Sequence, residues 1–268
     1  RIEELHADPE FLADGALRRQ ELDAIRAELQ ASEVDPELVG LLYDAIVASE
    51  GSAEVMVRFR SSSNAEDSVD FGGAGLYDST SVCAADSFDD DDEGPSLCDP
   101  DQPDERTIER GLLKVWAGLW KVGAWEERSW YGIDPLAVGM GVLVDTRSKD
   151  EQANIVAFTG VPSDPDDARY LVNAQVGWLD VVSAESGVWP ERCLLTVESG
   201  QVVDIERVSP GSEVDQVLTD PQLRALGEGL WQVEQVFPHD YGVMLDTEWK
   251  VLSDGRLIIK QVRSFAPG

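Results

Sequence analysis

The stretch MLDTEWKVLSDGRLIIKQVRSF, residues 244–265, limits the fold more than any other part of the chain. Polar and apolar residues alternate on both sides of Asp254-Gly255, a dipeptide typical of a two-residue hairpin turn. We therefore expect two antiparallel strands with one apolar and one polar face. The apolar face, which can pack against a helix, is expected to carry Leu245, Thr247, Trp249, Val251, Ile258 and Val262.

The polar face of this hairpin gathers charged and amide side chains. Opposite positions lie equally far from a two-residue turn, which pairs Asp246 with Arg263 and Glu248 with Gln261. Two carboxylates at this spacing can hold a hard cation such as Mg²⁺, which takes oxygen ligands and keeps waters and phosphate oxygens. The alternative is a solvent-facing sheet with an ordinary Asp/Arg cross-strand pair.

The first half of the chain has helical periodicity around one strand. Apolar spacing predicts a helical pair over Leu17–Gln30 and Pro36–Ser49, and Val55–Arg60 has the pattern of a strand. From Thr107 the spacing predicts one long amphipathic helix. Its core face is expected to carry Ile108, Leu112, Trp116, Leu119 and Trp120.

The second half has short strand-like runs separated by Gly, Pro and Asp clusters. Thr219-Asp220-Pro221 is a helix start, because a capping hydroxyl precedes a proline in the first turn. The pattern predicts an α+β fold with largely antiparallel sheets rather than regular βαβ alternation. The expected strands lie at 141–145, 154–160, 169–177, 192–198 and 201–208.

Composition limits the partners that this chain can have. Its 268 residues are 43% hydrophobic, enough for a sizeable core, and its net charge is -32. A surface with this much negative charge repels polyanions, and we therefore expect neither nucleic acid nor a membrane as partner. Any anionic ligand must bind in a local pocket. The chain begins at Arg1 without a methionine or signal sequence, so we expect a processed product or a segment of something longer.

One stretch, VRFRSSSNAEDSVDFGGAGLYDS at residues 57–79, combines two arginines with a glycine-rich segment. Its glycines allow backbone N–H groups to approach phosphate oxygens, and Arg60 can make bidentate charge-assisted hydrogen bonds to them. Arg58 lies on the same strand face and is either a second ligand contact or a partner of surface acids. The stretch therefore predicts a phosphate site.

With Arg60 followed by SSSNAED and GGAGLYDS, then VWAGLWKVGAWEER, DTEWK and KQVR, the chain resembles a known family over nearly its whole length. It is similar to the ATP-binding domain (PEP/pyruvate-binding) shared by pyruvate phosphate dikinase, phosphoenolpyruvate synthase and glucan water dikinase. The resemblance implies the ATP-grasp fold, in which two α+β subdomains enclose a nucleotide cleft. We expect a partial first subdomain at 1–138, with an acidic insert at 83–106, and a second at 139–268.

The resemblance also implies ligands and roles. The cofactors are ATP and Mg²⁺, and in this family a histidine on a separate domain accepts the phosphoryl group. Neither His6 nor His239 sits in the family's histidine motif, so we expect the acceptor domain elsewhere, in the same or a partner chain. The resemblance assigns phosphate contacts to Arg60, Gly73, Ala74, Gly75, Gln261 and Arg263, catalytic roles to Arg60 and Arg263, and Mg²⁺ to Asp246 and Glu248.

The acidic insert suggests a second hypothesis. Asp89, Asp91 and Glu93 resemble the start of a calcium loop, and the alternative is a plain solvated acidic loop. Cys83 and Cys98 bracket this loop, and a disulfide between them would indicate an exported or cell-envelope location instead of the cytoplasm that the family implies. The second hypothesis is therefore a non-catalytic, exported ATP-grasp-like module.

Overall fold

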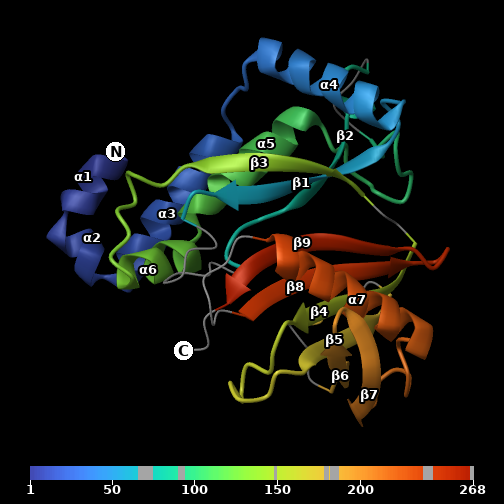
Figure 1. The fold of residues 1–268 in the computed structure, drawn as a ribbon. Coiled ribbons are helices and arrows are strands. Elements are labelled where there is room, and N and C mark those ends of the chain that lie inside the picture. Colours follow the sequence, from blue (N-terminus) through green and yellow to red (C-terminus); the bar gives the residue numbers. More distant parts are fainter. Residues whose placement is uncertain are drawn as a thin grey trace. The chain divides into compact units, whose positions relative to one another are not determined.

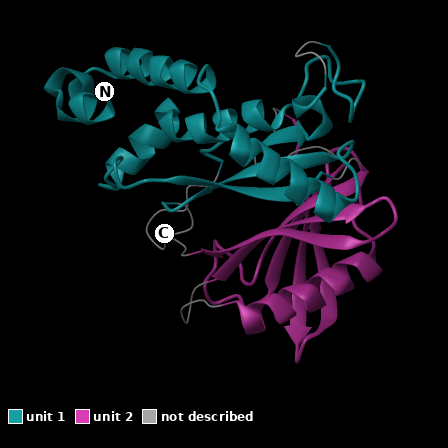
Figure 2. Cartoon of the chain, turned by 90° about the horizontal axis from the view of Figure 1, so that it is seen from above, with its two compact units in different colours: residues 1–147 teal, residues 148–268 magenta. Residues whose placement is uncertain are grey.

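The computed structural model forms two compact units, residues 1–147 and 148–268 (Figure 2). Helices pack beside two antiparallel sheets, so the predicted α+β class is confirmed. Among the described residues, no helix is both long and apolar enough to cross a bilayer. The structure describes residues 1–65, 75–89, 94–147, 150–177, 181, 187–237 and 244–265.

Unit 1 packs helices against a three-stranded antiparallel sheet of order β2-β1-β3 (Figure 1). The predicted helical pair is confirmed as α3 and α4, whose N-terminal N–H groups are capped by Asp14 and Asp35. Its elements are α1 (Ile2–Ala7), α2 (Pro9–Ala13), α3 (Gly15–Gln30), α4 (Pro36–Glu50), β1 (Met56–Ser63), β2 (Thr80–Cys83), η1 (Ala85–Ser87), α5 (Ile108–Ala117), η2 (Gly118–Trp120), α6 (Val122–Trp130) and β3 (Met140–Thr146).

The single long helix predicted from Thr107 is wrong beyond Ala117. A 3-10 turn, η2, follows α5, and Lys121 then adopts an extended backbone with ψ 138° before α6 begins. The apolar face consequently divides between two clusters: α5 packs around Phe59, whereas η2 and α6 pack around Phe11. Two separate cores, rather than one helix face, decide this break.

The acidic insert is organised around one buried carboxylate. Both oxygens of Asp86 accept backbone hydrogen bonds, from Leu97 N and Arg106 N at 2.8 Å each. A disulfide joins Cys83 to Cys98, with their Cα atoms 5.8 Å apart. The disulfide and the hydrogen bonds to Asp86 therefore fix the described part of the predicted insert. Apart from the end of β2, the regular structure in that part is η1 and one isolated β-bridge.

Unit 2 is a six-stranded antiparallel sheet of order β7-β6-β5-β4-β8-β9, with α7 packed across one face (Figure 1). The predicted helix start is confirmed, because Thr219 and Gln222 form a capping box at α7. The elements are β4 (Glu151–Phe158), β5 (Tyr170–Val176), β6 (Glu191–Glu198), β7 (Gln201–Ser209), α7 (Asp220–Val236), β8 (Met244–Leu252) and β9 (Leu257–Phe265).

Strand β3 belongs to unit 1. It pairs with β1 along its whole length, so residues 139–147, which the sequence analysis placed in the second subdomain, lie in the first unit. Non-local strand pairing, which no local pattern specifies, decides where this unit ends.

A buried carboxylate ties the sheet of unit 2 to the start of α7. Glu191 on β6 is 1% exposed and accepts hydrogen bonds from the backbone N–H groups of Val217 and Leu218, at 2.9 and 3.0 Å. It also pairs with Arg207 of β7, which in turn reaches Asp220. One side chain thus joins two strands to the loop that leads into α7.

Candidate functional site

The terminal hairpin of β8 and β9 turns through three residues. Leu252 N donates to Arg256 O at 2.9 Å, which encloses Ser253, Asp254 and Gly255. Gly255 has a φ of 85°, a left-handed conformation that glycine adopts without steric cost. The predicted two-residue turn is therefore wrong, and a three-residue loop with glycine in this conformation takes its place.

The extra loop residue shifts the pairing next to the turn. Val251 lies opposite Leu257, and Lys250 lies opposite Ile258. Ile258 therefore shares the face of Lys250, and its predicted position on the apolar face is wrong. Leu257 packs against the core instead.

A β-bulge then restores the predicted register. Trp249 pairs with Ile259, but the next pair is Glu248 with Gln261, which leaves Lys260 as the extra residue of β9. Strict alternation would put Lys260 on the apolar face beside Val262, where a buried charge is costly. The polar pairs predicted from the sequence are confirmed because the bulge compensates for the longer turn.

Asp246 and Arg263 form a cross-strand ion pair in which the carboxylate is buried and the guanidinium is partly buried. Arg263 Nε and Nη2 both donate to Asp246 Oδ2, at 2.8 and 2.5 Å. Asp246 is only 5% exposed, so this pair is not on a solvent-facing sheet. Burial raises the pKa of Asp246 above its ordinary value, Arg263 opposes that shift, and the neighbouring Glu248 adds to it.

The other oxygen of the same carboxylate is unsatisfied. Asp246 Oδ1 is buried and has no hydrogen-bond partner among the described residues. A buried charged acceptor without a partner costs free energy that a bound cation would recover. Glu248, two residues along the strand, presents a second carboxylate on the same face.

These two carboxylates fit a magnesium ion. Mg²⁺ usually takes one or two carboxylates and completes its octahedron with waters and phosphate oxygens. In the described part of the chain, no cluster of three or more His, Cys, Asp or Glu residues could hold a metal. The arrangement therefore suits an ion that arrives with a phosphate ligand better than one held by protein alone.

Two further polar groups lie beside Glu248, the amide of Gln261 and the ammonium of Lys260. Gln261 is half-buried, and its side chain makes no hydrogen bond with any described residue. Lys260 Nζ lies 3.7 Å from Glu248 Oε2, so the bulge brings a cation to the site that sequence reasoning missed. The sequence does contain a sign of this bulge, because strict alternation would place the charged Lys260 on the apolar face of the hairpin.

Arg60 lies on β1 of unit 1, opposite Leu143 of β3. Its guanidinium is weakly engaged: Nε is 3.8 Å from Asp145 Oδ2 and is buried without a hydrogen bond among the described residues. Arg58, by contrast, donates to Ser81 at 3.3 Å. Of the two arginines, Arg60 is thus better placed to bind an anionic ligand.

The glycine segment is only partly described. Gly73 and Ala74 lie outside the described residues, whereas Gly75 is exposed with a φ of 73°. Tyr77, two residues later, accepts a hydrogen bond of 3.0 Å from Nη1 of the buried Arg128 and lies beneath its guanidinium. The C-terminal end of the segment is therefore anchored to α6.

The calcium and histidine predictions fall largely outside the described residues. Asp91, Glu93 and His239 are not described, and Asp89 alone gives no calcium site. His6 packs edge-on against Trp125, with ring centroids 5.8 Å apart, as a histidine in a structural role does.

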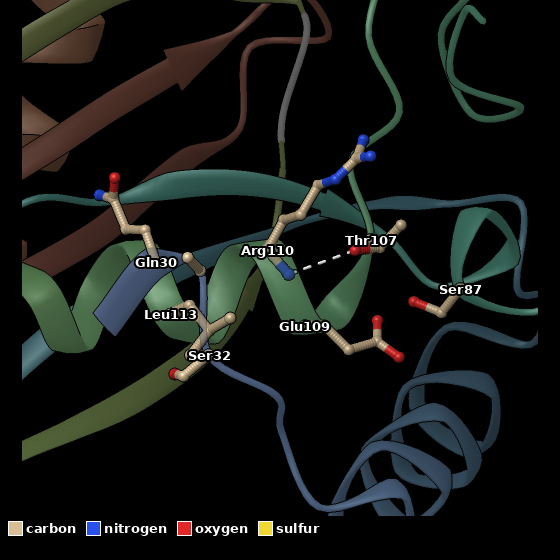
Figure 3. Close-up of a pocket in the computed structure, with 8 residues that line it drawn as sticks. Gln30, Ser32, Ser87, Thr107, Glu109, Arg110 and Leu113 are labelled. Carbon is tan, nitrogen blue, oxygen red and sulfur yellow. Dashed lines mark hydrogen bonds between the residues drawn. The ribbon is translucent and has the colours of Figure 1, made fainter. Parts of the chain in front are cut away.

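A pocket of about 320 Å³ lies between the end of α3 and the start of α5 (Figure 3). Arg110 N donates to Thr107 Oγ1 there at 3.2 Å, which is the N-terminal cap of α5. The pocket contains none of the predicted site residues, so it is not our candidate. Its lining consists of Gln30, Ala31, Ser32, Ser87, Thr107, Glu109, Arg110 and Leu113.

Comparison with known proteins identifies the family. Residues 12–266 match the family described as "Pyruvate phosphate dikinase, AMP/ATP-binding domain", so the match spans nearly the whole chain. None of the curated proteins compared with the chain matches it. The helices and antiparallel sheets agree with the ATP-grasp-like α+β fold expected from the resemblance. The chain therefore belongs to the AMP/ATP-binding domain family of pyruvate phosphate dikinase.

Proposed function

We propose that this ATP-binding domain takes its nucleotide as the Mg²⁺ complex and serves a dikinase-like phosphotransferase. The observation that carries the proposal is the polar face of the terminal hairpin. There Arg263 donates to one oxygen of Asp246, the other oxygen is buried without a hydrogen-bond partner in the described part of the chain, and Glu248 lies two residues away on the same face. This is a donor set for a metal-bound phosphate.

Each residue of this face has a separate role in the proposal. Asp246 and Glu248 would hold Mg²⁺, which neutralises phosphate charge when it is bound. Arg263 uses Nε and Nη2 on Asp246, so its Nη1 would donate to a phosphate oxygen, and the amide of Gln261, which lies opposite Glu248, would donate to another. For unit 1, the family resemblance supports Arg60 and the glycine segment as phosphate-binding groups in this proposal.

The phosphoryl acceptor in this proposal is a histidine on another domain. Such transfer needs little covalent chemistry from the protein, because positioning and charge neutralisation supply most of the rate. Among the described residues, His6 is packed against Trp125 and is not a candidate acceptor. The final acceptor molecule would be chosen by domains other than this one.

Metal removal tests the proposal directly. We expect a nonhydrolysable ATP analogue to bind at least about tenfold more tightly with Mg²⁺ than with a chelator, a difference of about 1.4 kcal/mol. Isothermal titration calorimetry on this chain measures both affinities. Equal affinity with and without Mg²⁺ would contradict the metal assignment, and no binding in either case would contradict nucleotide binding by the chain.

The second candidate, a non-catalytic exported module, rests on the disulfide between Cys83 and Cys98. Disulfides persist mainly in oxidising compartments, which is unusual for a phosphotransferase. The carboxylate of Asp246 favours the first candidate. Its Oδ1 is buried without a hydrogen-bond partner among the described residues, and a protein that binds no ligand there gains nothing from leaving it so.

Thiol counting distinguishes the two candidates. Cys193 is buried, and burial with the nearby Glu191 raises its pKa to about 12, so at about pH 8 it should stay a protonated, unreactive thiol. For native protein purified without reductant we expect no reactive thiol, one after denaturation, and all three cysteines after reduction. Three thiols after denaturation alone would remove the observation that supports the exported module.

A further inference from the structure

The β-bulge at Lys260 changes the charge of the site. Without it, alternation would put Lys260 on the opposite face from Asp246 and Glu248, and Arg263 would be the only cation that β9 supplies to this face. With it, the ammonium of Lys260 comes within 3.7 Å of Glu248 Oε2. Asp246 then pairs with Arg263, and Glu248 pairs with Lys260.

The two cations differ in how firmly they are held. Arg263 makes two hydrogen bonds to Asp246 with a rigid guanidinium. Lys260 makes one ion pair, beyond hydrogen-bond distance, and its side chain is 20% exposed. The remaining lysine of this strand face, Lys250, is buried and pairs with Glu151 at 3.8 Å. Of these three cations, Lys260 is therefore the one best able to change partners.

A metal ion on Glu248 requires such a change. The ion and the ammonium compete for one carboxylate, since both need its lone pairs and both are repelled by the other's charge. A lysine ammonium is a compact point charge on a flexible four-carbon stem, which can move to a phosphate oxygen nearby.

We propose that Lys260 is a phosphate-binding residue, whose ammonium pairs with Glu248 in the free protein and moves to a phosphate oxygen when a metal takes Glu248. This inference rests on the proposed binding of Mg·ATP. It predicts that removal of the ammonium has opposite effects on two affinities. The affinity for a metal ion alone should rise, and the affinity for a metal–nucleotide complex should fall.

The experiment uses Mn²⁺ as the metal, because electron paramagnetic resonance counts the free ion. For Lys260→Gln we expect Mn²⁺ alone to bind about threefold more tightly, the size of a partly exposed ion pair. We expect the Mn²⁺ complex of a nonhydrolysable ATP analogue, measured by calorimetry, to bind about tenfold more weakly. Lys260→Arg should restore most of the nucleotide affinity.

Arg256→Gln is the matched control, because it removes the same charge from the same hairpin. Arg256 is exposed and pairs with Asp254 in the turn. The affinities of this variant for Mn²⁺ and for the Mn²⁺–nucleotide complex should stay within about twofold of the parent. Such a result would show that the effect of Lys260→Gln comes from a local contact and not from the loss of one positive charge on an acidic chain. In a Glu248→Gln background, Lys260→Gln should no longer change Mn²⁺ affinity.

The outcomes separate this inference from the function on which it rests. If the parent binds the metal–nucleotide complex and Lys260→Gln binds it equally well, the role of Lys260 is overturned and the proposed function stands. If both affinities fall together, Lys260 is only structural and the inference is again overturned. If the parent binds no metal–nucleotide complex, the proposed function and this inference are both overturned.

Discussion

Replacing Glu248 with Gln is expected to weaken Mg·ATP binding by about 100-fold while the protein still folds normally. The amide removes one anionic ligand, and loss of even an outer partner that only orients a metal ligand typically costs about 10–100-fold in affinity. Glu248 contributes little to folding, because its partner Lys260 is 3.7 Å away and both side chains are partly exposed. Isothermal titration gives the affinity, and urea unfolding checks that stability changes by less than about 1 kcal/mol.

The control for Glu248→Gln is Asp254→Asn. Asp254 is an exposed carboxylate in the turn of the same hairpin, and Asn can still accept the hydrogen bond from Arg256 N. This variant should bind Mg·ATP as the parent does. Parent-like binding by Glu248→Gln would show that the hairpin carboxylate does not hold the metal.

Replacing Glu191 with Ala is expected to lower the free energy of unfolding of unit 2 by about 3–5 kcal/mol, the usual cost of breaking a buried ion pair. The change leaves Arg207 without one partner and leaves the N–H groups of Val217 and Leu218 without acceptors. Because the chain has two units, unfolding need not be two-state. Hydrogen exchange of the amides of β6 and β7 therefore gives the better local measurement.

Glu198→Ala is the comparison for that loss. Glu198 lies at the exposed end of the same strand and should cost less than about 0.5 kcal/mol. A loss below about 1 kcal/mol for Glu191→Ala would mean that the network does not hold the start of α7. Nucleotide affinity should change little when Glu191→Ala is measured under conditions where unit 2 remains folded.

Sequence patterns were most reliable where neighbouring residues set the structure. The alternation around Asp254-Gly255 predicted both polar pairs of the hairpin, and Thr219 predicted the start of α7. The arginine and glycine motifs, with the terminal DTEWK and KQVR stretches, identified the family over nearly the whole chain. The hairpin pairs came out correctly because the longer turn and the bulge have opposite effects on register.

The amino-acid sequence by itself determined the order and type of the main elements, because periodicity and capping depend on residues only a few positions apart. Tertiary structure alone decided the partners that come from far along the chain: Glu191 meets Val217 and Leu218, and α5 ends where two separate cores meet. It also decided the bulge that moves Lys260 to the polar face. The physical reason is that burying a charge is costly, so packing of the apolar face overrides strict alternation at that one position.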